Sequence, residues 1–292
     1  MDRCPPFSLQ MLPLEVTLCA LGEATLPPFL GSALRGVIGH ALLHNRQAYD
    51  YFYCNRRVDG SGLDTANPYV LTLPPEGKTA YAAGETIVFR LLLLGGAAAY
   101  ARAMVDALRA IEHRGLGVAR VPFQLIEVRH GVHDRFVWSD GVFYPAAARP
   151  VPLPVLRLED VAGCKLAFHT PLRIRRKGVP LRAVDAPTLL RNLVARTVQA
   201  CERYGDGADA DEAARLREAA QAVRIETYAL RWRDLTRYSG RIHAKMEIGG
   251  LVGTVALAGD LTPFVPWIHA ARILHIGKNT TFGLGYFSAS FR

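Results

Sequence analysis

The stretch TIVFRLLLLGGAAAYARAMVDALRAIEHRG, residues 86–115, contains two predicted secondary-structure elements in succession. Thr86 to Leu94 is largely apolar, as in a buried strand, and Gly95-Gly96 interrupts it. The alanine-rich segment from Ala97 to His113 favours a helix, and Gly115 is typical of the position just after a helix end. The stretch therefore predicts a strand followed directly by a helix.

The alternation of strands and helices extends on both sides of this stretch. Residues 9–21 are predicted to form a strand, and Pro27-Pro28 opens a helix over residues 29–45, because proline is tolerated in the first turn of a helix. Residues 49–68 are predicted as a loop. A strand over residues 123–129 and a hairpin around Asp140-Gly141 complete the first half.

The second half repeats this order after a predicted linker, because residues 145–155 contain four prolines. Strands are predicted over residues 165–174, 223–232, 246–257 and 286–291, helices over residues 186–204 and 260–275, and an acidic spacer over residues 205–212. Two copies of the order β-α-β-β-α-β predict an α+β protein with two tandem ferredoxin-like domains, residues 1–150 and 151–292.

The composition indicates a folded cytoplasmic protein. The 292 residues are 50% hydrophobic, which excludes a disordered chain. The five cysteines are scattered and form no C-x-x-C pair, as expected for reduced thiols. The first residues lack the basic and apolar regions of a signal peptide, and the uncharged run from Leu91 to Ala101 has eleven residues, whereas a membrane span needs about 20.

The charge is distributed unevenly along the chain. The net charge is +9, of which residues 1–150 contribute +1 and residues 151–292 contribute +8. Such a basic domain typically binds a polyanion, so nucleic acid is favoured over a membrane surface as partner.

The segment HIGKNTTFGLGY, residues 275–286, is the most distinctive in the chain. It is not a phosphate-binding Walker A loop, because Arg272 stands where the first glycine is required and a strand, rather than a helix, follows. Its glycines would let the backbone approach a ligand closely; the alternative is a turn that only joins a helix to a strand. The candidate RNA contacts in this segment are Gly277, Lys278, Asn279, Gly283 and Gly285.

Four segments of the chain resemble one protein family. They are Gly277-x5-Gly283-Leu284-Gly285, the segment PFLGSALRG at residues 28–36, the segment FHTPLR at residues 168–173, and Arg237-Tyr238-Ser239 ahead of GGLVG at residues 249–253. Together, and in the order in which they occur along the chain, these segments resemble the RAMP superfamily of CRISPR proteins. Within that superfamily they resemble the endoribonucleases that process CRISPR repeat RNA, the Cas-six family.

The resemblance implies a metal-independent endoribonuclease that needs no cofactor. It would bind the repeat hairpin of precursor crRNA and cut it once by attack of a ribose 2′-hydroxyl, leaving a 2′,3′-cyclic phosphate. The mature crRNA would be released or retained, and other Cas effector subunits are further partners that the resemblance suggests.

The resemblance also places the active site at the first helix and the loop after it, where His44, His40 and Arg35 are the candidate catalytic residues. Histidine transfers protons near neutral pH, and a guanidinium binds phosphate through a two-pronged fork. His44 ranks above His40 because it lies at the predicted helix end, and a nearby arginine or tyrosine remains an alternative. Packing at the helix surface is another alternative for both histidines. A zinc site on this pair is disfavoured because no third ligand is suggested.

The remaining candidate RNA-binding residues are basic. They are Arg46 after the first helix and, in the second half, Arg173, Arg175, Arg176, Lys177, Arg182, Arg231, Arg233, Arg237 and Arg241. The densest run would bind the phosphates of a hairpin stem, and the alternative is a solvated charged surface.

Two other functions stay open at this point. One is a non-catalytic RAMP subunit that holds crRNA within a CRISPR effector complex and has no need of the two histidines. The other is a basic ferredoxin-like protein of a different RNA pathway.

Overall fold

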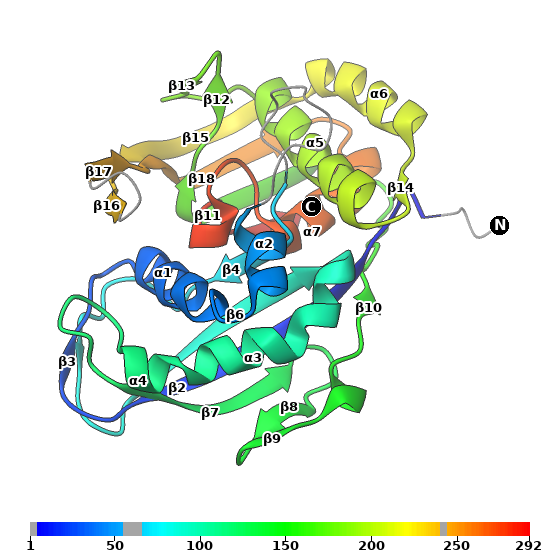
Figure 1. Ribbon diagram of the computed structural model, residues 1–292. Helices are drawn as coiled ribbons and strands as arrows, with labels where there is room; N and C mark the ends of the chain where they lie inside the picture. Colours follow the sequence, from blue (N-terminus) through cyan, green and yellow to red (C-terminus); the bar gives the residue numbers. More distant parts are fainter. Residues whose placement is uncertain (1–4, 55–65, 240–243) are drawn as a thin grey trace. The chain divides into compact units, whose positions relative to one another are not determined.

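The computed structural model describes residues 5–54, 66–239 and 244–292. The chain forms two compact units: an N-terminal unit, Gln10–Val151, and a C-terminal unit, Met1–Leu9 with Pro152–Arg292. The predicted boundary at residue 150 lies next to this division, but the first nine residues group with the C-terminal unit and not with the first domain as predicted. Figure 1 shows the elements of both units.

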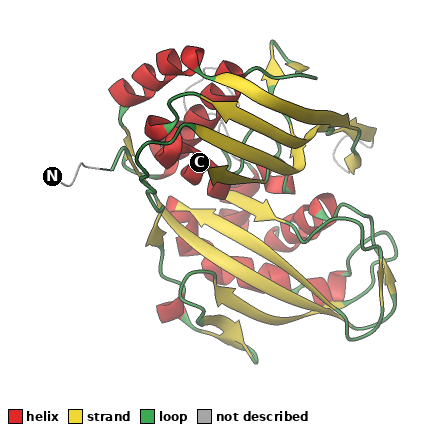
Figure 2. Cartoon of the chain, turned by 180° about the vertical axis from the view of Figure 1, so that it is seen from behind, coloured by secondary structure: helices red, strands yellow, loops and turns green. Residues whose placement is uncertain are grey.

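The N-terminal unit is an antiparallel sheet with helices on one face. Every second residue of β2 from Leu12 to Ala20 is buried, so that one face of the strand faces the core. The helices α1 (Gly31–Leu42) and α3 (Ala101–Arg109) pack together on that face, and Figure 2 shows the strands from the other side. The strand order is β4 (Tyr69–Thr72), β6 (Thr86–Leu94), β2 (Gln10–Ala20), β7 (Phe123–His130), β8 (Phe136–Ser139) and β9 (Val142–Phe143), with β10 (Val151–Pro152) pairing with β2 off this path.

The C-terminal unit repeats the architecture. Its antiparallel sheet has the order β15 (Arg224–Arg233), β18 (Gly250–Ala258), β11 (Gly163–Leu172) and β19 (Phe287–Phe291). The helices α5 (Ala186–Tyr204) and α7 (Val265–Leu274) pack against each other, with Leu193 and Trp267 fully buried. In each unit the first strand lies between the third and the fourth, which is the ferredoxin-like order. The predicted fold is therefore confirmed.

Short elements complete the chain. The small strand pairs are β1 (Phe7–Ser8) with β14 (Gly207–Ala208), β3 (Ala24–Thr25) with β5 (Ala80–Tyr81), β12 (Arg175–Arg176) with β13 (Val179–Pro180), and β16 (Thr236–Ser239) with β17 (Ala244–Glu247). The remaining α-helices are α2 (Arg46–Tyr53), α4 (Ile111–Arg114) and α6 (Ala210–Ala219), and the 3₁₀ turns are η1 (Gly95–Tyr100), η2 (Pro145–Ala147), η3 (Ala220–Ala222), η4 (Thr262–Phe264) and η5 (Thr280–Phe282). Within the described ranges, no helix is both long and apolar enough to span a membrane.

Three predicted elements differ from the structure. The loop predicted over residues 49–68 is wrong in part, because Asn45 caps the helix α2 by accepting a hydrogen bond from the Ala48 N–H at 3.1 Å; residues 55–65 lie outside the described ranges. The predicted acidic spacer leads into α6, whose first turn is capped by Asp209. The strand predicted over residues 246–257 is two strands, β17 and β18, in different sheets.

Candidate functional site

The first predicted site lies where α1 ends and α2 begins. The helix α1 ends at Leu42, and the backbone N–H of His44 donates to the Ala41 carbonyl at 3.3 Å. Asn45 then starts α2, so that His44 occupies a short junction between two helices and its side chain is exposed. An exposed imidazole at such a junction is accessible to a substrate.

Arg114, which the sequence analysis did not single out, contacts the first-ranked histidine. Its Nη2 atom lies 2.6 Å from Nε2 of His44. A guanidinium has donors only, so Nε2 of His44 is the acceptor and the imidazole is neutral, with its proton on Nδ1. Arg114 is the last residue of α4 and lies 70 positions away in the sequence, which is why helical spacing around His44 could not reveal it.

Arg35 is held by an aromatic side chain from α2. Its guanidinium carbon lies 4.5 Å from the ring centroid of Tyr53, and the Tyr53 hydroxyl donates to the Arg35 carbonyl at 2.7 Å. Gly39 leaves the space for that ring, since a Cβ at this position would lie 2.7 Å from it. Burial raises the pKa of Tyr53 well above its ordinary value, so this hydroxyl stays protonated and is not a base at neutral pH.

The other two candidates of this region have different surroundings. His40 is exposed in the last turn of α1. Arg46 forms an ion pair with Asp50 at 2.9 Å along α2, and this partner raises the pKa of the guanidinium. No group of three His, Cys, Asp or Glu side chains suited to a metal ion occurs among the residues that the structure describes.

The glycine-rich loop is bonded to the end of β11 in the C-terminal unit. The N–H of Lys278 donates to the Arg173 carbonyl at 2.8 Å, and the N–H of Gly285 donates to Pro171 at 3.1 Å. The hydroxyl of Thr170 donates to the Gly283 carbonyl at 2.8 Å. Two segments of the predicted resemblance, residues 168–173 and residues 277–285, therefore form one structure.

A buried arginine that sequence reasoning missed anchors this loop. Arg196 of α5 donates from Nη2 to the Leu274 carbonyl at 3.0 Å and from Nε to the His275 carbonyl at 3.1 Å, at the end of α7. Burial lowers the pKa of Arg196 to about 10, so it remains charged at neutral pH. Burial, with the charge of Arg196, lowers the pKa of the His275 imidazole to about 3. The position of Arg196 within a predicted helix gave no sign of its carbonyl partners at the end of α7.

Arg173 differs from its prediction. Only 5% of the residue is exposed, and its Nη1 donates to the Gly249 carbonyl at 2.8 Å. Burial lowers the pKa of the guanidinium. Arg173 therefore connects the end of β11 to the glycine pair before β18, and it does not share an exposed face with Arg175, because β11 ends at Leu172.

The other candidate RNA-binding residues of the C-terminal unit differ in their exposure and contacts. Arg175, Arg176 and Lys177 are exposed on the β12–β13 hairpin. Arg182 lies over the Trp232 ring at 4.5 Å, and Arg237 lies over the Phe282 ring of the glycine-rich loop at 4.6 Å. Arg231 is exposed and Arg233 half-buried on β15, Gly277 and Asn279 are half-buried, and Arg241 lies outside the described residues.

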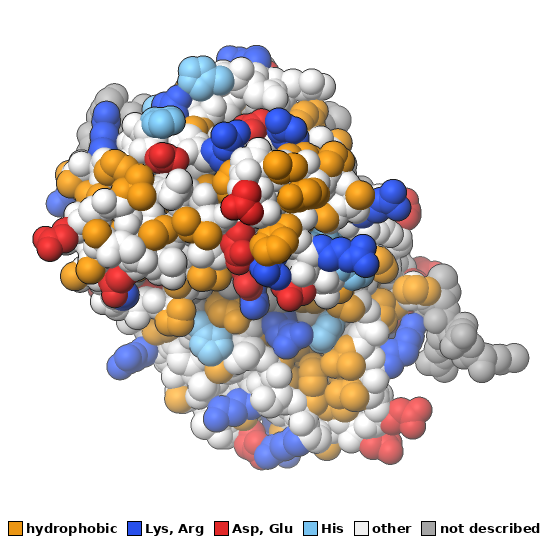
Figure 3. Space-filling view, turned by 90° about the horizontal axis from the view of Figure 1, so that it is seen from below, with side chains coloured by type: hydrophobic (Ala, Val, Ile, Leu, Met, Phe, Trp, Pro, Cys, Tyr) orange, Lys and Arg blue, Asp and Glu red, His pale blue; other side chains and the backbone are white. Residues whose placement is uncertain are grey.

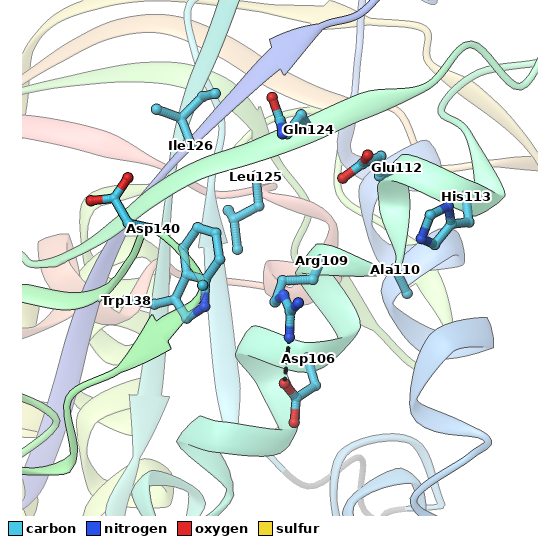
Figure 4. A pocket seen from close by; sticks show the side chains of 11 residues that line it. Asp106, Arg109, Ala110, Glu112, His113, Gln124, Leu125, Ile126, Trp138 and Asp140 are labelled. Carbon is cyan, nitrogen blue, oxygen red and sulfur yellow. Dashed lines mark ion pairs between the residues drawn. The ribbon is translucent and has the colours of Figure 1, made fainter.

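A separate cavity of about 620 Å³ lies in the N-terminal unit. Figure 4 shows Trp138 and Asp140 of the β8–β9 hairpin opposite Arg109 of α3, with Glu112 beyond. Arg109 pairs with Asp106 at 3.7 Å. Three carboxylates against one guanidinium make this cavity unsuited to an RNA phosphate, and none of the predicted site residues lines it. On the face seen in Figure 3, acidic and basic side chains are likewise interspersed.

Comparison with known protein families finds one match in each half of the chain. Residues 166–287 match the family of the CRISPR-associated endoribonuclease Cas6. This part of the chain, which makes up most of the C-terminal unit, is similar to that family. Residues 9–150 match a second family, whose description is "N-terminal domain". No curated protein sequence matches the chain.

Solved Cas6 structures share the fold of this chain. A chain of a partial Cas6-RT-Cas1–Cas2 complex has a TM-score of 0.65 at 14% identity over 99% of this chain, which spans about half (47%) of that longer chain. A Thermus thermophilus Cas6 product complex has a TM-score of 0.61 at 15% identity, covering 96% of this chain and 99% of the other. Another Cas6 product complex has a TM-score of 0.54 at 24% identity, with coverage of 96% and 100%.

Proposed function

We propose that this chain is a metal-independent endoribonuclease that binds the repeat hairpin of precursor crRNA and cuts it once, giving mature crRNA that is either released or retained. The observation that carries the proposal is the exposed His44 imidazole, whose Nε2 lies 2.6 Å from the Arg114 guanidinium, at the α1–α2 junction of a chain whose C-terminal part matches the Cas6 family. In such a pair the imidazole can act as the general base, and the guanidinium can stabilise the negative charge on the phosphate.

The chemistry is an intramolecular displacement at phosphorus. His44 takes the proton of a ribose 2′-hydroxyl, and the 2′ oxygen forms a bond to the adjacent phosphorus. The bond to the 5′ oxygen breaks, and this leaving oxygen takes a proton from an acid, for which the exposed His40 is the candidate. The products are a 2′,3′-cyclic phosphate and a 5′-hydroxyl. The 2′-hydroxyl restricts the reaction to RNA.

The C-terminal unit would supply the binding energy. The β12–β13 hairpin presents Arg175, Arg176 and Lys177 to solvent, where they would bind the phosphates of the stem. The glycine-rich loop is fixed by Arg196 from one side and by the end of β11 from the other. Such a fixed loop supports close contact between its backbone and the RNA.

The test is a denaturing-gel assay of end-labelled repeat RNA in the presence of EDTA, with parallel substrates that carry a single 2′-deoxy at each candidate position. Cleavage at one site, abolished by one 2′-deoxy, is the expected result. Co-elution of the product with the protein on gel filtration tests retention. Tight binding of the repeat RNA without any cleavage would contradict the proposed enzymatic activity. It would favour the alternative, a non-catalytic subunit of a CRISPR effector complex.

A further inference from the structure

The contact between Arg114 and His44 fixes more than the position of the histidine. A neutral imidazole carries its proton on one nitrogen and accepts a hydrogen bond at the other. Because Nη2 of Arg114 lies 2.6 Å from Nε2 of His44, the lone pair of Nε2 is occupied. Nε2 therefore carries no proton, which a general base requires. Its lone pair is occupied by Arg114, however, so it cannot accept a proton from a substrate while this contact persists.

The backbone around Arg114 makes this contact a built feature of the N-terminal unit. The helix α4 packs on α1 and ends directly after Arg114, at Gly115, whose φ is +70°. A Cβ on Gly115 would overlap the backbone of Arg120, so only glycine fits this reversal of the chain. Leu116 and Val121 then close the turn with two backbone hydrogen bonds at 2.8 and 3.1 Å. The half-buried Arg114 therefore lies directly before a fixed turn and in contact with His44, just after the end of α1.

A phosphate is the group that would compete for this guanidinium. An N–H···O⁻ bond to a phosphate is charge-assisted and two-pronged, whereas the bond to Nε2 has a neutral acceptor and uses one N–H. An RNA phosphate placed beside His44 would therefore attract Arg114 away from the imidazole, and the lone pair of Nε2 would become available at the moment the substrate is in place.

We propose that Arg114 is the residue that positions and masks His44, and that it transfers its hydrogen bond from Nε2 to the scissile phosphate when RNA binds. This inference rests on the proposed function. In the bound state Nε2 takes the 2′-hydroxyl proton, the 2′ oxygen bonds to phosphorus, the bond to the 5′ oxygen breaks, and Arg114 faces the negative charge of the phosphorane. His44 afterwards loses its proton to solvent and accepts from Arg114 again.

The first test needs no RNA. Imidazole ¹⁵N shifts, assigned with His44→Gln, report which ring nitrogen carries the proton in the wild type, Arg114→Leu, Arg114→Lys and the control Arg109→Leu. Arg109 lies on the adjacent helix α3 and pairs with Asp106. We expect Nε2 to be unprotonated in the wild type, Arg114→Lys and Arg109→Leu, and protonated in Arg114→Leu. A protonated Nε2 in the wild type, or an unchanged ring in Arg114→Leu, overturns the masking contact.

The second test is single-turnover cleavage at saturating repeat RNA. Arg114→Leu should slow cleavage about 100-fold, the cost of losing one donor to the transition state, while the Kd for RNA changes less than about threefold. Arg114→Lys should recover part of the rate, and Arg109→Leu should cleave normally. A full rate in Arg114→Leu overturns the transfer to phosphate. If the wild type itself fails to cleave, the proposed function fails, while the ¹⁵N result still decides whether the masking contact exists.

Discussion

The glycine-rich loop of the C-terminal unit and the α1–α2 junction of the N-terminal unit are built in opposite ways. The loop is held by buried polar groups of neighbouring elements: Thr170 of β11 and Arg196 of α5 donate to its backbone carbonyls or to those at the end of α7. At the junction, His44 and His40 point outward, and His44 is in contact with Arg114. One region fixes a shape with buried hydrogen bonds, and the other keeps titratable groups at the surface.

The contrast separates stability from chemistry. Buried polar groups are costly when they lose a partner, so changes in the loop should lower the free energy of unfolding. An exposed imidazole contributes little to folding, so changes at the junction should lower the rate and leave the fold intact.

The largest effect is expected for Gly285→Ala in the loop. Gly285 has a φ of +72°, and a Cβ there would overlap the carbonyl oxygen of Ile276. The free energy of unfolding should fall by roughly 4 kcal/mol, from backbone strain and loss of the loop's packing, as measured by urea unfolding. The matched control is Gly178→Ala, with a φ of +83° and open space around the Cβ, which should cost about 1 kcal/mol. If both substitutions lowered the free energy of unfolding equally, the close packing around Gly285 would not contribute to stability.

The second effect is on rate. His44→Ala should slow RNA cleavage at least about 100-fold, equivalent to about 2.7 kcal/mol, with an unchanged melting temperature and RNA affinity. The control His113→Ala removes an exposed histidine from α4, next to Arg114, and should leave the rate unchanged. A full rate in His44→Ala would remove this residue from the proposed chemistry.

Repetition and local pattern predicted most of the fold. Two rounds of alternating strands and helices sufficed for the tandem ferredoxin-like architecture, and α5 begins and ends at the predicted residues, Ala186 and Tyr204. The helices that the prediction missed depend on caps. Asn45 starts α2, and Asp209 with Glu212 starts α6 in the pattern of a capping box. Both signals are present in the sequence.

The sites were less predictable because their partners are distant in the chain. Exposure of the predicted residues His44, Arg175 and Arg176 follows from local polarity. Arg114 and Arg196 acquire their partners only through folding, 70 and about 78 positions away. The position of Arg173 in a basic run indicated solvent exposure, whereas the glycine pair after β17 provides a buried carbonyl for it. Charge density in a sequence does not show which guanidinium is buried.

The third effect concerns RNA affinity. The double variant Arg175→Glu, Arg176→Glu should weaken binding of repeat RNA about 30-fold at low salt, because phosphate contacts are lost and repulsion is added. The slope of log K against log salt should decrease in magnitude by about 1.5. The control Arg215→Glu, Arg217→Glu changes the same net charge on the exposed side of α6 and should bind almost normally. If both double variants lost the same RNA affinity, the β12–β13 hairpin would act only through the net charge of the protein and not through specific phosphate contacts.

The smallest effect tests whether the His275 imidazole at the start of the glycine-rich loop is buried and neutral, in contrast to the exposed histidines of the α1–α2 junction. Because the pKa of His275 is lowered from 6.5 to about 3 in the folded protein, the unfolded chain binds more protons than the folded one between these values. The stabilising contribution is therefore complete above pH 6.5 and is lost as the pH falls below it. Between pH 7.5 and pH 5.5 the loss should be about 1.4 kcal/mol.

Urea unfolding of the wild type and His275→Asn at these two pH values isolates this contribution. Asparagine tolerates the positive φ of +54° at this position, and the backbone carbonyl that accepts from Arg196 is retained. The pKa of His269 is also lowered by burial, but this residue is present in both proteins, so its effect cancels in the difference. The wild type should lose about 1.4 kcal/mol more than His275→Asn on acidification. Identical pH dependence would mean that His275 titrates as an exposed histidine does, and the loop would then resemble the α1–α2 junction more than the buried scaffold described above.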